Sequence, residues 1–207
     1  MPLIDELWRD LDRISRAGIR PVYSLVDGTT WVAISYRLGR AIRTLPRVLR
    51  IPALCAHKPL DLALSTITKV ALSPAAEIGG GLRLGQVGGI CVVEDAYIGR
   101  DCDLSEGVTI ASCGGAPWIG DRVLIGPGAK LAGPIRVGND AAIEPNAVVE
   151  SDVPDGATVA GIPARVVAWT GSRGRLVRGR KRPPLLQAMR GLVRGLLPRP
   201  TQLLLRD

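Results

Sequence analysis

The chain has 207 residues, which is enough for one core with extensions but not for two ordinary domains. It is 46% apolar yet has no Phe, 3% aromatic residues and 25 glycines, so small and branched aliphatic side chains must build its core, as in repeat proteins. The net charge of +8 lies near the end, because residues 165–207 hold eleven Arg and Lys residues and one acid, Asp207.

Residues 1–73 predict an α-helical module. Apolar residues recur at helical spacing over residues 3–16, again from Trp31 to Leu45, and a third time over roughly 60–72. The opposite face of the second helix is basic and carries Arg37, Arg40 and Arg43.

From residue 74 to 168 the period changes to six, which predicts a mainly β domain. One row of branched aliphatic residues recurs every six positions: Ile78, Leu84, Val92, Ile98, Leu104, Ile110, Ile119, Ile125, Leu131, Val137, Ile143 and Val149. A second inward row lies two residues earlier: Ala76, Leu82, Ala96, Cys102, Val108, Val123, Ala129, Ile135, Ala141 and Ala147. Three hexads supply three short strands and turns, so coils of about eighteen residues stack into a triangular parallel β-helix. A buried α/β sheet is excluded because there is no room for crossover helices.

Two interruptions break the hexad, around residues 85–89 and 112–117. Interruptions of a solenoid map to loops on one face, often the binding face. We therefore expect the functional site beside them.

Residues 169–207 predict a basic linker and a short amphipathic basic helix. No aromatic residues are interleaved in the linker as stacking platforms, so nucleic acid is not expected as a partner. The segment could make a peripheral contact with an anionic membrane surface, or the helix could pack on the protein, and both interpretations stay open.

The compartment is expected to be the cytoplasm, with the inner membrane surface as the place of any peripheral contact. The N-terminus is charged from its start, which argues against a signal peptide, and no run of 18 uncharged apolar residues occurs. The four cysteines form no CxxC pair and have no histidine nearby, so no metal site is expected.

Three runs of the repeat region carry a family pattern: GLRLGQVGGICVVEDAYIGRDCDLSEGVTIAS, GGAPWIGDRVLIGPGAKLAGPIRVGNDAAIEPNAVVESDVP and GIPARVV. In these runs the chain resembles the serine acetyltransferase-like branch of the hexapeptide-repeat acyltransferases, and most closely its members in polysaccharide biosynthesis. The resemblance implies a left-handed parallel β-helix, acetyl-CoA as co-substrate, no metal, and a homotrimer with active sites between its copies.

The resemblance also implies contacts with CoA from two motifs. They are Gly126, Gly128, Ala129 and Lys130 of IGPGAK, and Gly161, Pro163, Ala164 and Arg165 of GIPAR. The corners of a solenoid explain the glycines equally well, whereas the two cations suit the phosphates of CoA.

The chain departs from the family at the catalytic position. The family pattern GLxIxHxxGIVI places a general-base histidine where this chain has Gln86. A neutral amide cannot act as a general base, although it could donate a hydrogen bond to the thioester oxygen. The aspartate that precedes this histidine in serine acetyltransferases is Gly85 here, and the histidine of their next loop is missing, so free serine is not expected as acceptor.

Three explanations of the missing histidine stay open. Another group could be the base, and the nearest carboxylates are Glu94, Asp95 and Glu106, although each of them fits an ordinary surface charge of the solenoid better. The acceptor could be an amine, or the chain could be an inactive or substituted family member. The leading prediction is an acetyl-CoA-dependent O- or N-acetyltransferase acting on a saccharide or other small acceptor, and the alternative is a catalytically inactive trimeric scaffold.

Other reactive side chains predict no further chemistry. The one histidine, His57, lies in the helical module and is interpreted as a packing or surface residue, which excludes a three-histidine zinc site. Cys102 falls in an inward row, and a nucleophilic Cys113 needs an activating group that no motif supplies.

Overall fold

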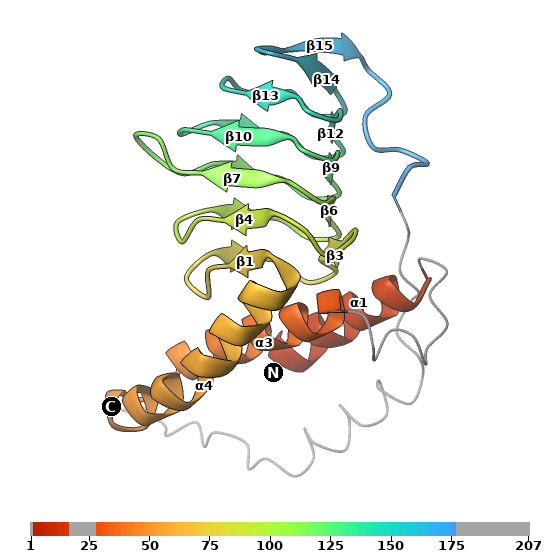
Figure 1. The fold of residues 1–207 in the computed structure, drawn as a ribbon. Helices are drawn as coiled ribbons and strands as arrows, with labels where there is room; N and C mark the ends of the chain where they lie inside the picture. The colour runs from red at the N-terminus through yellow and green to blue at the C-terminus, as the bar shows by residue number, and fades with distance from the viewer. Residues whose placement is uncertain (1, 17–27, 177–207) are drawn as a thin grey trace, which may run out of the picture.

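A computed structural model describes residues 2–16 and 28–176, which form a triangular solenoid with three helices at one end (Figure 1). The helices are α1 (Pro2–Arg16), α3 (Gly28–Arg43) and α4 (Arg47–Thr68). No helix in the described ranges is long and apolar enough to cross a lipid bilayer. The predicted C-terminal helix and most of the basic linker lie outside the described residues.

Fifteen short strands form three sheets, one on each face of the prism. Sheet A contains β1 (Val70–Leu72), β4 (Ile90–Val92), β7 (Thr109–Ala111), β10 (Lys130–Ala132) and β13 (Val148–Val149). Sheet B contains β2 (Glu77–Ile78), β5 (Tyr97–Ile98), β8 (Trp118–Ile119) and β11 (Arg136–Val137). Sheet C contains β3 (Arg83–Leu84), β6 (Asp103–Leu104), β9 (Leu124–Ile125), β12 (Ala142–Ile143), β14 (Thr158–Gly161) and β15 (Ala164–Ala168). Neighbouring strands pair in parallel, except that β14 and β15 form an antiparallel hairpin, so the predicted mainly β solenoid is confirmed.

The core is the inside of the prism, as the hexad predicts. Every residue of both predicted inward rows is at most 5% exposed, and these side chains belong to one hydrophobic cluster. Since only branched aliphatic residues, Ala and one Cys fill the two rows, the lack of Phe reflects the narrow cross-section of each coil.

The structure corrects the third predicted helix and the start of the solenoid. Helix α4 begins and ends earlier than predicted, and residues 70–72 form strand β1 rather than a last helical turn. Lys69 closes the helix in the left-handed conformation, and the buried Leu72 lies six residues before Ile78. The hexad therefore starts before the predicted boundary at residue 74, because pairing of β1 with β4 overrides a pattern that also fits a helix.

Buried arginines attach the helices to the first coils. The side chain of Arg37 is 1% exposed and pairs with Asp10 at 2.9 Å, and it donates to the Ile78 carbonyl at 2.7 Å. Arg13 of α1 pairs with Asp103 of β6 at 2.7 Å. The predicted basic face of α3 is therefore partly an internal surface, because the Arg37 side chain is buried against α1 and β2.

Candidate functional site

The turns between sheet C and sheet A stack into one edge of the prism, which we call corner CA. It consists of residues 85–89, 105–108, 126–129 and 144–147. Backbone bonds join the turns: Gly107 N to Gly88 O at 2.7 Å, Gly128 N to Glu106 O at 2.9 Å and Asn146 N to Pro127 O at 2.8 Å. The edge is therefore continuous, with roughly 4.8 Å between successive turns.

Gln86 and Glu106 lie on successive turns of corner CA. Gln86 is exposed in the first interruption, and Glu106 is half-buried on the next turn. An ideal Cβ atom at Gly85 would lie 3.4 Å from Glu106 Oε2. The Glu106 carboxylate therefore occupies space beside Gly85, the neighbour of Gln86 in the chain.

Glu94 and Asp95 lie at a different edge, corner AB, where the chain passes from sheet A to sheet B. Both are exposed in the turn between β4 and β5. The second interruption, residues 112–117, lies at this same edge between β7 and β8. The expectation that both interruptions share one face is thus wrong in detail: they occupy the two opposite edges of sheet A, because the first follows a strand of sheet C and the second a strand of sheet A.

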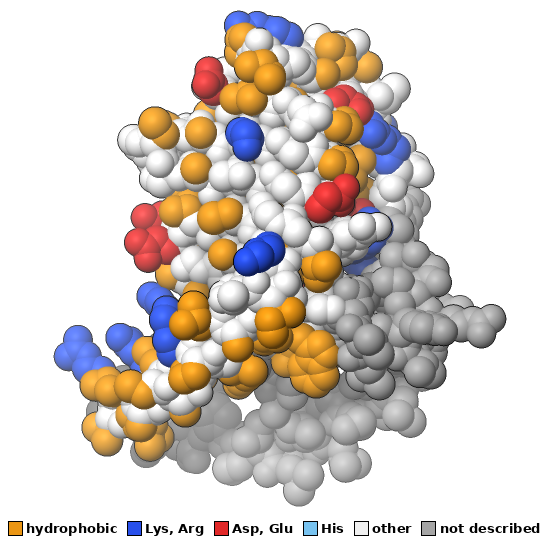
Figure 2. All heavy atoms as spheres, viewed as in Figure 1, with side chains coloured by type: hydrophobic (Ala, Val, Ile, Leu, Met, Phe, Trp, Pro, Cys, Tyr) orange, Lys and Arg blue, Asp and Glu red, His pale blue; other side chains and the backbone are white. Residues whose placement is uncertain are grey.

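The outer surface of sheet A lies between these two edges. One column of its outward side chains is Ala71, Cys91, Thr109, Lys130 and Val148, in register from β1 to β13. Figure 2 shows this face of the molecule with few charged side chains across the middle of the solenoid. Lys130 is exposed, and no ion pair forms at its ammonium group within the described ranges.

The GIPAR hairpin continues the line of corner CA at the end of the prism farthest from the helices. Strand β14 pairs with β12 so that Val159 lies over Ile143, and the hairpin tip at Gly161 and Pro163 follows. Arg165 is exposed on β15, and one of its guanidinium N–H groups donates to the Ala164 carbonyl at 3.0 Å. The structure therefore brings both predicted CoA motifs, Gln86 and Glu106 to one edge, while Glu94 and Asp95 lie apart.

The solenoid itself requires the glycines of IGPGAK. A Cβ atom on Gly126 would lie 2.8 Å from Ile143 O, and one on Gly128 would clash with the Asn146 side chain. Gly128 also has φ of 71°, a conformation that favours glycine. These two glycines are explained by stacking, and Ala129 by its place in the core, so the motif offers Lys130 as its exposed polar group.

The remaining reactive groups have structural surroundings. His57 is 7% exposed, and its Nε2 lies 3.1 Å from Ser35 Oγ, so it packs between α4 and α3. Burial raises the pKa of Cys102 to about 12, which makes this thiol inert at neutral pH. Cys113 is exposed at corner AB. Among the described residues no group of three His, Cys, Asp or Glu side chains could hold a metal ion.

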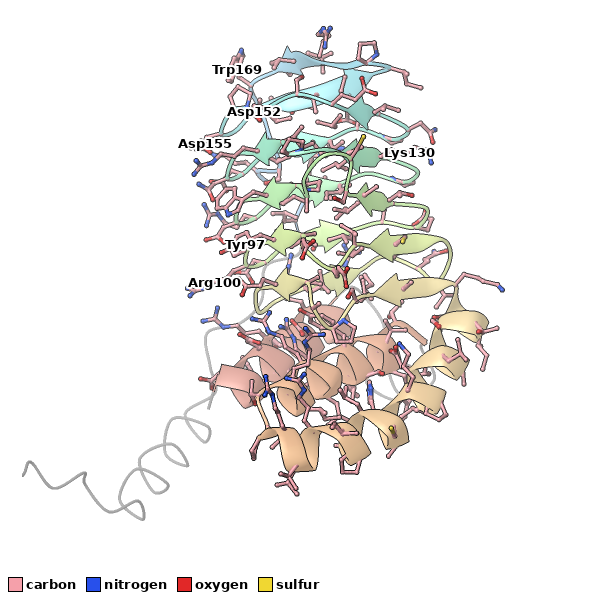
Figure 3. All side chains as sticks on the ribbon, turned by 90° about the vertical axis from the view of Figure 1, so that its left-hand side faces the viewer. Tyr97, Arg100, Lys130, Asp152, Asp155 and Trp169 are labelled. Carbon is pink, nitrogen blue, oxygen red and sulfur yellow. The ribbon has the colours of Figure 1, made fainter. Side chains whose placement is uncertain are left out.

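An aromatic ladder on sheet B was not predicted from the sequence. The rings of Tyr97 and Trp118 stack with centroids 5.1 Å apart, and the Arg136 guanidinium lies 4.5 Å from the Trp118 ring centre. In Figure 3 Tyr97 and Lys130 lie at opposite sides of the prism. The ladder therefore belongs to another face than the candidate site, and Trp118 has Tyr97 and Arg136 as its partners.

Comparisons with known proteins agree with this geometry. Residues 116–151 match the family model described as "Bacterial transferase hexapeptide (six repeats)". A serine acetyltransferase of Mycobacterium tuberculosis is 40% identical over 106 residues, covering 49% of this chain and 46% of that protein. The crystal structure of serine acetyltransferase from Brucella abortus is 30% identical with a TM-score of 0.67, covering 81% of this chain and 70% of that one.

The chain belongs to the serine acetyltransferase-like hexapeptide-repeat family. A second Brucella abortus structure, of serine acetyltransferase in complex with coenzyme A, is 31% identical with a TM-score of 0.67 and covers 81% of this chain and 68% of that chain. This family membership confirms the predicted left-handed β-helix acyltransferase fold. The chain spans about half the length of the Mycobacterium relative.

Proposed function

We propose that this chain is an acetyltransferase that moves the acetyl group of acetyl-CoA to a hydroxyl or amine of a small or saccharide acceptor. The observation that carries the proposal is the alignment of Gln86, Glu106 and both predicted CoA motifs along corner CA, beside the outer face of sheet A. The outward column of this face contains the small side chains of Ala71, Cys91 and Thr109, which leave room for an extended pantetheine chain. Lys130 and Arg165 are exposed cations along corner CA and suit the phosphates.

The two interruptions support a trimer whose sites lie between copies. Within one chain the loop at residues 112–117 cannot face Gln86, because sheet A separates corner AB from corner CA. A three-fold axis parallel to the prism brings corner CA of one copy to corner AB of the next. We therefore propose three composite sites, each with Gln86 and Glu106 from one copy and the second interruption from its neighbour.

We assign the role of general base to Glu106. In the proposed reaction the acceptor oxygen or nitrogen attacks the thioester carbonyl carbon, the C–S bond breaks, and the acceptor proton passes through the base to the departing CoA sulfur. Of the three predicted carboxylates only Glu106 lies on corner CA, where it is half-buried beside Gly85, whereas Glu144 of the same corner pairs with Arg175. Gln86 can donate its amide N–H to the oxyanion but cannot take the proton.

The second candidate function is a catalytically inactive trimeric scaffold. Gln86 favours it, since a carboxylate is a weaker base than imidazole at neutral pH. The exposed Lys130 and Arg165 along corner CA favour the enzyme, because the phosphates of CoA would give both cations a partner.

The test measures the formation of CoA from acetyl-CoA. Chromatography is the detection method, because the exposed cysteines would react with a thiol reagent. Saccharides, amino acids and amines are tried as acceptors with the unmodified chain, Glu106→Gln, and the matched double variant Glu94→Gln with Asp95→Asn. We expect turnover by the unmodified chain, a loss of about 100-fold or more in Glu106→Gln, and little change in the double variant. A comparable loss in the double variant would instead assign the base to corner AB of the neighbouring copy.

A chain that binds CoA but turns over only after Gln86→His would mean that Gln86 is an inactivating substitution. If neither the unmodified chain nor Gln86→His turns over acetyl-CoA and neither binds CoA, the result supports the scaffold. Light scattering tests the assembly and is expected to give the mass of three chains.

A further inference from the structure

Helix α4 carries most of its apolar side chains on the outside of the protein. In a helix that packs on a domain, the apolar stripe normally faces the core. Here the inward face is mixed: His57 and Thr68 are buried, Leu54 and Leu64 are half-buried, and Asp61 accepts a hydrogen bond from Ser35 Oγ at 3.3 Å. The outward face is a continuous surface made by Val48, Leu49, Ile51, Pro52, Cys55, Ala56, Pro59, Leu60, Leu62, Ala63 and Ile67, all exposed.

The exposure of this outward face is large. Val48 is 84% exposed, Ile67 80%, Ile51 65% and Leu62 64%. At 1.5 Å per residue the helix is about 33 Å long. The exposed apolar side chains therefore form one extended patch along it and are not scattered single surface residues. In Figure 1 α4 projects from the lower side of the solenoid, and Figure 2 shows hydrophobic side chains gathered there among Lys and Arg.

The charges around the face are of one sign. Arg43, Arg47, Arg50 and Lys58 are exposed beside it. Between residues 28 and 69 the sequence has a single acid, Asp61, and its carboxylate faces α3. The outward face is therefore apolar with a cationic border and no acidic group.

We propose that α4 lies in the plane of an anionic lipid bilayer surface, with its apolar face in the boundary between headgroups and acyl chains. A helix with one apolar face and basic borders binds there by burial of the apolar side chains and by attraction to anionic lipids. Two other occupants fit the charge less well. A second α4 would place like charges against each other, and residues 177–207 of this chain are themselves strongly basic.

The test is flotation of the full chain with vesicles of phosphatidylcholine alone or mixed 7:3 with phosphatidylglycerol. The triple variant Val48→Gln, Ile51→Gln and Leu62→Gln removes three exposed apolar side chains and leaves the charges intact. The matched control, Trp169→Gln, removes a side chain that is 70% exposed at the other end of the prism (Figure 3). We expect binding to the anionic vesicles that weakens with salt, a fall of more than about tenfold in the triple variant, and no change in the control.

A probe on the native Cys55 gives a second, local readout. A polarity-sensitive dye on this exposed thiol, with Cys91→Ser and Cys113→Ser, should shift its emission to the blue when anionic vesicles are added. The same dye on Cys113, with Cys55→Ser and Cys91→Ser, should not respond, because corner AB lies on the solenoid.

Three results would overturn the proposal. The first is no binding of the full chain to anionic vesicles. The second is unchanged binding by the triple variant, which would assign the contact to the basic C-terminal segment. The third is a smaller assembly of the triple variant in light scattering without a change in vesicle binding, which would make α4 a protein interface.

Discussion

Replacing Arg37 with Met tests how the helices are attached to the solenoid. The guanidinium is 1% exposed and donates to Asp10, Glu6 and the carbonyls of Ile78 and Gly79. Met fills most of the volume but leaves the buried Asp10 carboxylate with two backbone donors and no cation. Removing one partner of a buried ion pair costs about 3–5 kcal/mol, which for a chain of this length lowers the Tm by roughly 6–20 °C.

The assay is thermal unfolding followed by circular dichroism, with Arg43→Met as the matched control. Arg43 is exposed near the end of the same helix, so its loss should change the stability by less than about 0.5 kcal/mol. Equal Tm values for the Arg37 and Arg43 variants would show that the buried pair does not hold the helical module to the prism.

The stability lost in the Arg37→Met variant should depend on pH through the carboxyl group of Asp10. Burial raises the pKa of Asp10 above its ordinary value, and Arg37 and the N–H groups of Gly81 and Leu82 oppose this rise. Without Arg37 the pKa of Asp10 rises further. A carboxyl with a raised folded-state pKa contributes stability that is complete below its unfolded pKa and is lost as pH rises through the folded one. The Tm deficit of the variant should therefore be large at about pH 8 and smaller at about pH 4, and a deficit independent of pH would contradict this role of Asp10.

Three further predictions concern the solenoid. Because burial raises the pKa of Cys102 to about 12, a thiol reagent should label three cysteines in the folded chain and the fourth, Cys102, only after denaturation; a fourth fast label would contradict this. The change Gly126→Ala pushes a methyl group to 2.8 Å from a backbone oxygen and should lower the Tm even without CoA, whereas Gly85→Ala meets its nearest atom at 3.2 Å and should cost less. A double-mutant cycle of Tyr97→Ala and Trp118→Ala in urea should give a coupling free energy of about 0.5–1.5 kcal/mol, and zero coupling would mean that the stacked rings do not stabilise sheet B.

The sequence predicts the prism well because each inward position is repeated in every coil. Ile98 and Ile119 fill equivalent positions, so one misread hexad is corrected by its neighbours. The start of the solenoid lacks this redundancy. Its first strand follows directly on a helix, and the spacing of residues 60–72 fits a helix as well as a strand, so only pairing with β4 decides between them.

The sequence could have predicted which candidate residues share one edge of the prism. Gln86 and Glu106 are twenty residues apart, which is one coil plus the two-residue interruption, so they had to share a corner. The partners of Arg37 could not be found in this way. Asp10 lies 27 residues earlier, and no local spacing relates a helix to the first coil on which it packs.

We propose that acetyl-CoA binds along corner CA, and calorimetric titration of CoA into the full chain tests this binding most directly. We predict saturable binding by the unmodified chain, about tenfold or greater weakening by Lys130→Ala, and no change on Arg136→Ala, whose side chain lies on sheet B over Trp118. No binding by the unmodified chain, or equal affinity of all three forms, would contradict the proposed site.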